Sequence, residues 1–229
     1  MTTNDAPQVA RLLQRFCGNH LTSTLSTIER SAAGLTAHDC SDFLAQISAT
    51  NEVLSAAAEM KRLAGQINVT IHALGILLCL PHIFEDGERV EYASLGAGNT
   101  GRDFDLETNY RVAEFKFISW KGGPESIRQN SVFKDFFHLA ESESTKRKHL
   151  YVLGTEHPLK FLNGGRALNS VLSRNNKVRE LFYQRFGNRF TRVRDYYHFC
   201  QDRVTIQDVS CWLPALVTDA IGSNLGSKP

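Results

Sequence analysis

Hydrophobic and polar residues alternate along one stretch in the middle of the chain. In DFDLET, residues 103–108, every second residue is acidic, and Phe104 and Leu106 lie between the acids. In VAEFKFI, Glu114 and Lys116 alternate with apolar residues in the same way. A period of two predicts half-buried strands, and the short polar link between the segments predicts an antiparallel hairpin. We expect its apolar faces to pack inward and its other face to carry a cluster of carboxylates with one lysine.

Helical spacing dominates the chain before this point. Residues 7–33 repeat Leu and Phe at intervals of three and four, which predicts one long packing helix. A second helix is expected to begin at Ser41 or Asp42, since either residue is a favourable N-cap, and to run to Gly65. Together these helices predict an N-terminal helical segment over residues 1–65.

A third helix is expected over residues 66–80, where the surface is almost continuously apolar. We predict that it is buried and that it stops at Pro81, because the proline ring cannot continue a helix. The apolar run from Val69 is shorter than the roughly 20 residues that a bilayer requires, and it contains His72. No membrane association is therefore expected. No secretory signal is expected either, because the N-terminus, MTTNDAPQVARLL, has no basic region followed by an apolar core.

A turn at residues 85–88 and a first strand at residues 89–95 follow. The next loop, GAGNTG at residues 96–101, matches the dinucleotide fingerprint G-x-G-x-x-G. That fingerprint requires a helix that begins within the glycines, whereas a strand pattern follows here. We expect no nucleotide cofactor and interpret the glycines as a flexible link.

Beyond the hairpin, Pro124 occupies a typical first helical position. The helix that it starts is followed by LYVLGT, a short apolar strand, so the order from residue 66 is helix, three strands, helix, strand. We predict a core over residues 66–156 and a basic, mostly helical extension over residues 157–229 that packs on it and contains a late strand, RVTIQDVS. The residues of the central helix expected to face inward are Ile127, Phe133, Phe136, Phe137 and Leu139.

Composition narrows the class of protein. A hydrophobic fraction of 42% and a charged fraction of 22% are ordinary for a globular chain and exclude a disordered or fibrous one. The 5 cysteines are odd in number and include no CxxC pair. This argues against a disulfide framework or a thiolate zinc site and favours a reducing, cytoplasmic location.

Charge is distributed unevenly, although the net charge is only +2. Residues 1–59 contain three Lys or Arg against six Asp or Glu, whereas residues 160–203 contain ten against three. A basic second half can attract phosphates; the alternative is an ordinary solvated surface.

The residues of the hairpin carry a resemblance. The element order, with Asp105 on the second strand and the triplet Glu114, Phe115, Lys116 on the third, resembles the PD-(D/E)XK nuclease superfamily over residues 66–155. The resemblance implies a restriction-endonuclease-like α/β fold with an αβββαβ core, in which helices flank a mixed sheet. This sequence departs from the family motif in having no proline before its aspartate.

The resemblance also implies a chemistry. Asp105 and Glu114 would bind Mg²⁺, or Mn²⁺ in its place, with the carbonyl of Phe115 as a third ligand, and Lys116 would complete the catalytic set. Hard carboxylate oxygens suit Mg²⁺, which takes one or two protein carboxylates together with substrate phosphate. The implied activity is hydrolysis of phosphodiester bonds in nucleic acid, DNA more than RNA, in defence or repair.

Contacts with the nucleic acid are expected near the motif, where they would position the backbone without specifying sequence. Gln129 with Phe133 is similar to the QxxxY element of RecB-like nucleases, with Phe in place of Tyr. A carboxylate from a preceding helix often joins the metal site in this family, and the choice between Glu52 and Glu59 stays open. The residues expected to contact nucleic acid are Arg102, Lys121, Arg128, Gln129 and Lys134.

Three other interpretations stay open. The hairpin acids and lysine could form exposed ion pairs, each worth at most about 1 kcal/mol. The chain could be a non-catalytic module that binds nucleic acid or protein on a nuclease-like scaffold, with its acidic and basic parts forming a homodimer. It could also act as a subunit of a larger assembly.

Overall fold

A computed structural model of the 229-residue chain describes residues 6–18, 20–96, 103–118, 120 and 125–218. The chain forms two compact units, Met1–Asn68 and Val69–Pro229, which we describe separately.

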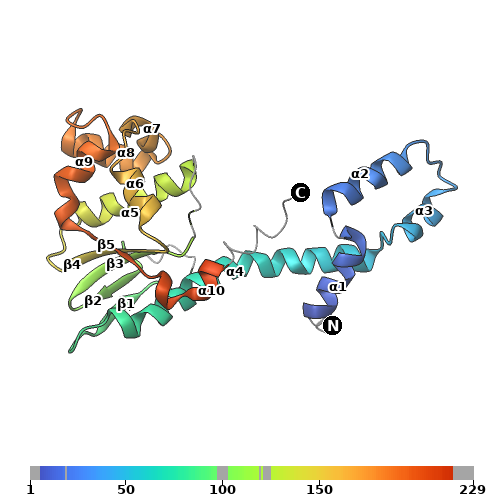
Figure 1. The fold of residues 1–229 in the computed structure, drawn as a ribbon, viewed down its shortest axis with the longest axis horizontal. Coiled ribbons are helices and arrows are strands. Elements are labelled where there is room, and N and C mark those ends of the chain that lie inside the picture. The colour runs from blue at the N-terminus through green and yellow to red at the C-terminus, as the bar shows by residue number, and fades with distance from the viewer. Residues whose placement is uncertain (1–5, 19, 97–102, 119, 121–124, 219–229) are drawn as a thin grey trace, which may run out of the picture. The chain divides into compact units, whose positions relative to one another are not determined.

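The first unit is helical (Figure 1). The predicted helix over residues 7–33 is wrong in one respect, because it breaks after Cys17. Gly18 adopts a φ of +59°, a left-handed conformation that glycine tolerates and that ends a helix. The second predicted helix also breaks, at Ser48, where φ is 56°. The helices of this unit are α1 (Ala6–Cys17), α2 (Leu21–Ala32), α3 (Cys40–Gln46) and the first part of α4 (Asn51–Ile83).

Helix α4 has 33 residues and includes the whole of the third predicted helix. Pro81 lies inside its last turn and does not end it, since the ring removes only one backbone donor there. The prediction of a buried helix is only half right: Ile76 and Cys79 are buried, whereas Leu74 and Leu78 are 52% and 56% exposed. By length and composition alone, α4 is apolar enough to cross a membrane, a test that core helices of soluble proteins also pass.

The second unit is an α/β structure built on a five-stranded mixed sheet with strand order β1-β2-β3-β4-β5. The predicted hairpin is confirmed, because β2 and β3 are antiparallel with Leu106 opposite Ala113. Helix α5 (Ser126–Glu141) connects β3 to β4, and β3–β4 and β4–β5 are parallel pairs. The predicted order of helix, three strands, helix and strand is therefore observed. The strands are β1 (Val90–Ala93), β2 (Leu106–Thr108), β3 (Arg111–Lys116), β4 (Arg147–Val152) and β5 (Thr205–Asp208).

Both faces of the sheet are covered by helices, as Figure 1 shows. Phe115 and Tyr151 pack with Ile76 of α4 on one face, and Val112 and Leu150 pack against α5 on the other. The polar face of the hairpin is thus not open to solvent along its length. Of the α5 residues predicted to face inward, four are buried, but Ile127 is 84% exposed because it lies in the first turn, before the helix reaches the sheet.

Residues after 156 belong to the second unit. Their helices extend the aromatic core, since Phe182 and Tyr196 pack against Phe133 and Phe137 of α5. The predicted late strand is confirmed as β5. The helices here are α6 (Glu156–Leu162), α7 (Leu168–Leu172), α8 (Asn176–Phe186), α9 (Val193–Cys200) and α10 (Pro214–Thr218).

Helix α4 lies close against Phe117, just after β3, at Gly75. A Cβ atom at this position would lie 2.5 Å from the ring of Phe117, nearer than any side chain allows. The same ring makes an edge contact with His72, one turn earlier on α4, at a centroid distance of 6.0 Å. A residue without a side chain is therefore required where the helix crosses the end of β3.

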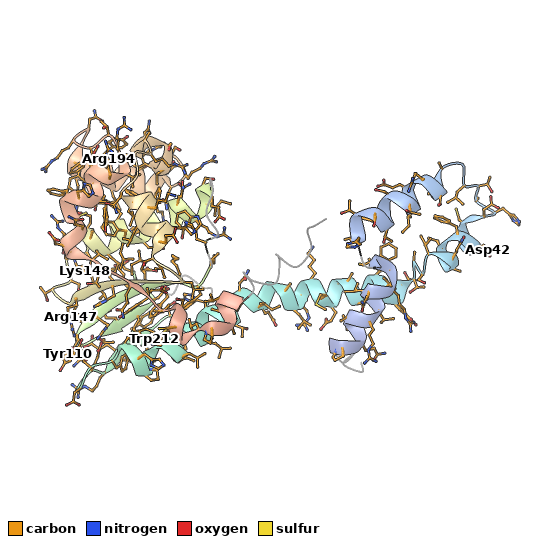
Figure 2. The ribbon with its side chains drawn as sticks, viewed as in Figure 1. Asp42, Tyr110, Arg147, Lys148, Arg194 and Trp212 are labelled. Atoms are coloured by element: carbon orange, nitrogen blue, oxygen red, sulfur yellow. The ribbon has the colours of Figure 1, made fainter. Side chains whose placement is uncertain are left out.

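A buried ion pair closes the opposite end of the hairpin. The guanidinium of Arg111 donates to both carboxylate oxygens of Glu88 at 2.6 Å, and it also donates to the Tyr151 hydroxyl at 2.9 Å. The side chains of Arg111 and Glu88 are 4% and 0% exposed. Nearby, Arg147 lies over the ring of Tyr110, 5.7 Å from its centroid (Figure 2). The ion pair between Arg111 and Glu88 fixes the turn before β1 to the start of β3.

Because His149 is buried, we expect the folded protein to lose stability in acid. Its ring is buried and stacked on Tyr151, and burial, with the charges of Arg111 and Arg147, lowers its pKa to about 4. The unfolded chain protonates this ring below about pH 6.5 while the folded chain does not. The unfolded state therefore binds more protons between pH 6.5 and 4, and stability falls as the pH falls through that window. The expected loss from this group is on the order of 2–3 kcal/mol.

Urea unfolding of His149→Leu at pH 7 and pH 4.5 measures this effect. The variant should lose less stability on acidification than the original protein. His38→Leu is the control, because His38 is exposed. Equal losses in all three proteins would show that His149 does not cause the acid sensitivity.

Candidate active site

Glu114 and Lys116 lie on the face of β3 that α5 covers. The Nζ of Lys116 is 3.9 Å from Oε2 of Glu114 and 2.7 Å from Oδ2 of Asp135 on α5. Asp135 is only 1% exposed. On its other side, Lys134 approaches Oδ1 of Asp135 at 3.5 Å. The end of β3 and the middle of α5 thus bring two carboxylates around one partly buried ammonium.

Asp105, immediately before β2, reaches the same place. Its Oδ2 accepts a hydrogen bond of 2.9 Å from the backbone amide of Phe115, and its Oδ1 lies 3.3 Å from Nε2 of His72 on α4. The carboxylate is close enough to Glu114 for a side-chain hydrogen bond between them. Asp105, Glu114 and Lys116, predicted from the sequence as a set, are therefore together in the structure.

The charges of this cluster are unbalanced. Burial, with the negative charges of Asp135 and Asp105, raises the pKa of Glu114 to about 9, although Lys116 acts in the opposite direction. Burial acts to lower the pKa of Lys116, but the charges of Asp135 and Glu114 outweigh it and raise that pKa. A lysine that stays charged is thus surrounded by more carboxylates than it can neutralise. Glu114 keeps a proton at neutral pH unless a second cation is present.

Asp105 behaves differently from Glu114. Burial acts to raise the pKa of Asp105, but the hydrogen bonds from His72 and from the Phe115 amide outweigh burial and hold that pKa below its usual value. Two neighbouring carboxyl groups with pKa values displaced in opposite directions are typical of functional sites. Asp105 is therefore a fixed anion and Glu114 a carboxyl group that a cation would ionise.

The fit to a metal ion depends on the metal. No group of three or more His, Cys, Asp or Glu side chains within the described residues is arranged to hold one. This does not suit zinc, which is held by three or four protein ligands. Mg²⁺ needs only one or two protein carboxylates and takes its other ligands from water and phosphate. The pair Asp105 and Glu114 fits that requirement.

The remaining residues predicted for the site are placed as follows. The ring of Phe115 packs in the core on the opposite face of the sheet, and its carbonyl as a metal ligand stays a prediction. Arg128 forms an ion pair with Glu125 and lines a small cavity together with Lys116. Gln129 lines a different cavity, and Lys134 is half-exposed beside Asp135. Arg102, Lys121 and the glycine-loop residues 97–101 lie outside the described residues.

The helix before the first strand contributes His72 to this site. Glu59 forms an ion pair of 2.6 Å with Arg62, and both Glu59 and Glu52 belong to the first unit. His72 and Asp135 were not identified from the sequence. Asp135 had a detectable signal, because it is an acid among the phenylalanines of the inward face of α5, whereas His72 had none beyond its position in an apolar helix.

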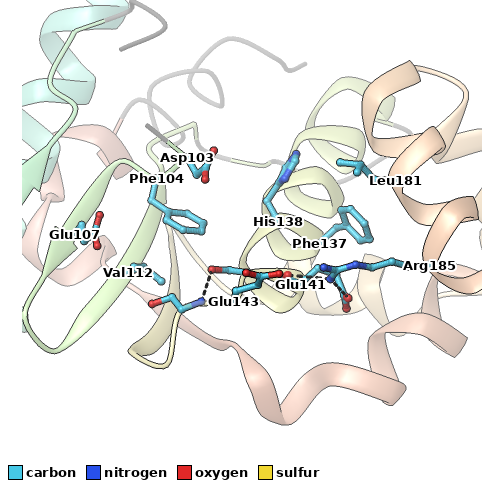
Figure 3. Close-up of a pocket in the computed structure, with 12 residues that line it drawn as sticks. Asp103, Phe104, Glu107, Val112, Phe137, His138, Glu141, Glu143, Leu181 and Arg185 are labelled. Atoms are coloured by element: carbon cyan, nitrogen blue, oxygen red, sulfur yellow. Dashed lines mark hydrogen bonds and ion pairs between the residues drawn. The ribbon is translucent and has the colours of Figure 1, made fainter. Parts of the chain in front are cut away.

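A neighbouring cavity of about 660 Å³ lies between the hairpin and α5 (Figure 3). Its lining includes Asp103, Glu107, Glu141 and Glu143. Arg185 pairs with Glu141 at 2.6 Å and so offsets only part of this negative charge. An acidic lining repels phosphate, so this cavity is not the place where a nucleic-acid backbone would lie.

No family model matches the chain, and no curated protein or solved structure shows significant similarity to it.

Proposed function

We propose that the protein is a Mg²⁺-dependent nuclease that hydrolyses phosphodiester bonds, in DNA in preference to RNA, on a restriction-endonuclease-like core. The observation that carries the proposal is the convergence of Asp105, Glu114 and Lys116 at one end of the hairpin, with the pKa of Glu114 raised to about 9. The sheet supports it, because the antiparallel strands β1 to β3 lead through α5 into the parallel strand β4.

Each residue has a separate role in this proposal. A bound Mg²⁺ ion would polarise the scissile phosphate and lower the pKa of a bound water. Asp105 is oriented for binding it by His72 and the Phe115 amide. Glu114 would give up its proton and become the second ligand. Lys116, now held by Asp135 at 2.7 Å, would stabilise the negative charge that develops on the phosphate.

The direct test uses four substrates: supercoiled plasmid, linear duplex, single-stranded DNA and RNA. Each is incubated with the protein in Mg²⁺, in Mn²⁺ or in EDTA. Cleavage that requires the metal and is lost in Glu114→Ala, with the fold retained, supports the proposal. Cleavage that persists in EDTA excludes the metal mechanism.

Lys116→Ala should lower the cleavage rate far more than the affinity for substrate. The lysine acts on charge that develops during the reaction, so we expect the rate to fall by about 10²–10³-fold and the affinity to change little. Single-turnover cleavage and binding measured without metal give the two quantities. Lys61→Ala is the control, because Lys61 is exposed and belongs neither to this cluster nor to the predicted nucleic-acid contacts, so it should change neither quantity. A Lys116→Ala protein that binds much more weakly yet turns over normally would contradict the proposed role.

One observation favours a second candidate function, a non-catalytic module on the same scaffold. Lys116 and Asp105 already have protein partners, Asp135 and His72, so the cluster is partly satisfied without substrate. Binding of nucleic acid without cleavage on all four substrates would support this alternative.

A further inference from the structure

A second cavity lies beside the N-terminal half of α5, on the side of α6 and the α6–α7 connection. Its volume is about 450 Å³, within the range of about 300–1,000 Å³ typical of small-ligand sites. Trp120 and His157 give it aromatic surface, and Lys160 and Arg166 give it positive charge. No carboxylate is among its described lining residues. We refer to it as the Trp120 pocket.

The aromatic wall of the Trp120 pocket is closely packed, with Trp120 itself 9% exposed, and it is incompletely hydrogen-bonded. The indole packs against His157 and Phe161 at centroid distances of 6.2 and 6.1 Å. Its Nε1, and Oε1 of Gln129 in the same lining, are buried and have no hydrogen-bond partner among the described residues. Buried polar atoms of this kind are rare in native proteins unless a ligand or water satisfies them. A flat ring beside an unsatisfied amide is a surface suited to a base.

The basic wall is held in place from outside the cavity. The carbonyl of Arg166 accepts a hydrogen bond of 3.0 Å from the Val193 amide, and the Gly165 carbonyl accepts one of 2.9 Å from Arg192. Arg166 also donates from Nε to Ser170 at 3.2 Å. Neither Lys160 nor Arg166 is in an ion pair with any described residue. Their charges are therefore available to an anion while the backbone beneath them is fixed.

The Trp120 pocket adjoins the candidate active site. A smaller cavity is lined by Lys116, Arg128 and Trp120, so it has the catalytic lysine in its wall and shares the indole with the larger cavity. Both cavities flank the first half of α5. A strand whose phosphate lies at Lys116 could place a neighbouring nucleotide against Trp120.

We propose that the Trp120 pocket holds one unpaired nucleotide of the substrate, next to the bond that is cleaved. Trp120 stacks on the base, Gln129 faces a base edge, and Lys160 and Arg166 bind its phosphate. Stacking on an aromatic ring requires a base that is free of its pair. The proposal rests on the proposed function in taking nucleic acid as the ligand, and it specifies the substrate class: single strands, overhangs or flaps in preference to continuous duplex.

The test is binding in EDTA, where metal-dependent cleavage does not occur. Fluorescence anisotropy compares a labelled oligothymidylate with a blunt duplex at one salt concentration. The double variant Lys160→Ala/Arg166→Ala should weaken single-strand binding by at least about 10-fold and duplex binding by less than about 2-fold. The matched control Arg174→Ala/Lys177→Ala removes the same charges from exposed positions nearby and should change both affinities by less than about 2-fold. Equal losses on both substrates in the pocket variant, or no loss, would overturn the proposal.

A second measurement detects the stacking itself. The chain has 2 tryptophans, so Trp212→Phe leaves Trp120 as the only indole emitter. Oligothymidylate should quench its fluorescence at the concentration at which it binds, and unchanged emission at saturation would rule out the stacked base. If single strands bind and quench Trp120 but are never cleaved, the nuclease proposal fails and the pocket stands. If the protein cleaves nucleic acid but the pocket and control variants bind equally well, the nuclease proposal stands and the pocket proposal fails.

Discussion

Glu114→Gln should give a protein that is more stable than the original and, under the proposed nuclease function, one whose cleavage of nucleic acid is strongly reduced. The folded-state pKa of Glu114 is raised to about 9 from a usual value of 4.5. The folded protein therefore keeps a proton that the unfolded chain releases, and stability falls as the pH rises from about 4.5 to 9. Glutamine has nearly the same shape as the protonated Glu114 side chain and cannot ionise. It should add at least about 1 kcal/mol at pH 8, while cleavage falls by about 10³-fold because one of the two proposed carboxylate ligands is lost.

Urea unfolding at pH 5, 7 and 9, with cleavage measured in parallel, separates the two effects. The stability difference between Glu114→Gln and the original protein should widen from pH 5 to pH 9. Glu143→Gln is the control, because Glu143 is an exposed carboxylate, and it should change neither quantity. A Glu114→Gln protein that is less stable at pH 8, or that cleaves normally, would contradict the role given to this residue.

Arg111→Met should destabilise the fold by about 3–5 kcal/mol. The substitution leaves Glu88 buried without its cation, and the Thr108 hydroxyl, at 2.6 Å, and the Glu85 amide, at 3.0 Å, are left as neutral donors to that carboxylate. Removing both charges together, in Arg111→Met/Glu88→Leu, should restore much of the loss, because a buried pair often contributes little more than an apolar replacement. A double-mutant cycle by urea unfolding gives the coupling energy.

Arg147→Met provides the comparison. Arg147 pairs with Glu85, and both side chains are about half exposed, at 49% and 50%. Such a pair is worth at most about 1 kcal/mol. If Arg111→Met costs no more than Arg147→Met, the buried pair does not anchor the hairpin.

The sequence predicted the hairpin and the order of the core elements because these depend on local alternation. Period-two spacing says which residues share a face of a strand, and it correctly grouped Glu114 with Lys116. It does not say what covers that face. The contribution of α5, through Asp135, follows from the packing of a helix that begins ten residues after the motif lysine, and no local pattern encodes that contact.

The helix boundaries failed for a different reason. Both predicted N-terminal helices have continuous helical spacing, but Gly18 breaks the first and Ser48 breaks the second by adopting left-handed conformations. Such conformations are not visible in hydrophobic periodicity. The prediction that the helix stops at Pro81 was wrong, since a proline near the end of a helix removes one hydrogen bond and leaves the turn in place. The Trp120 pocket was missed because its lining comes from four separate parts of the chain.

The missing side chain at Gly75 has a consequence for the chemistry. Because Gly75 has no side chain, α4 can lie against the ring of Phe117, and α4 also carries the His72 imidazole that contacts Asp105. A methyl group added at Gly75 would push α4 away from Phe117, and the His72 imidazole would move with the helix. The orientation of Asp105, the proposed metal ligand, therefore depends on the absence of a side chain one helical turn from His72.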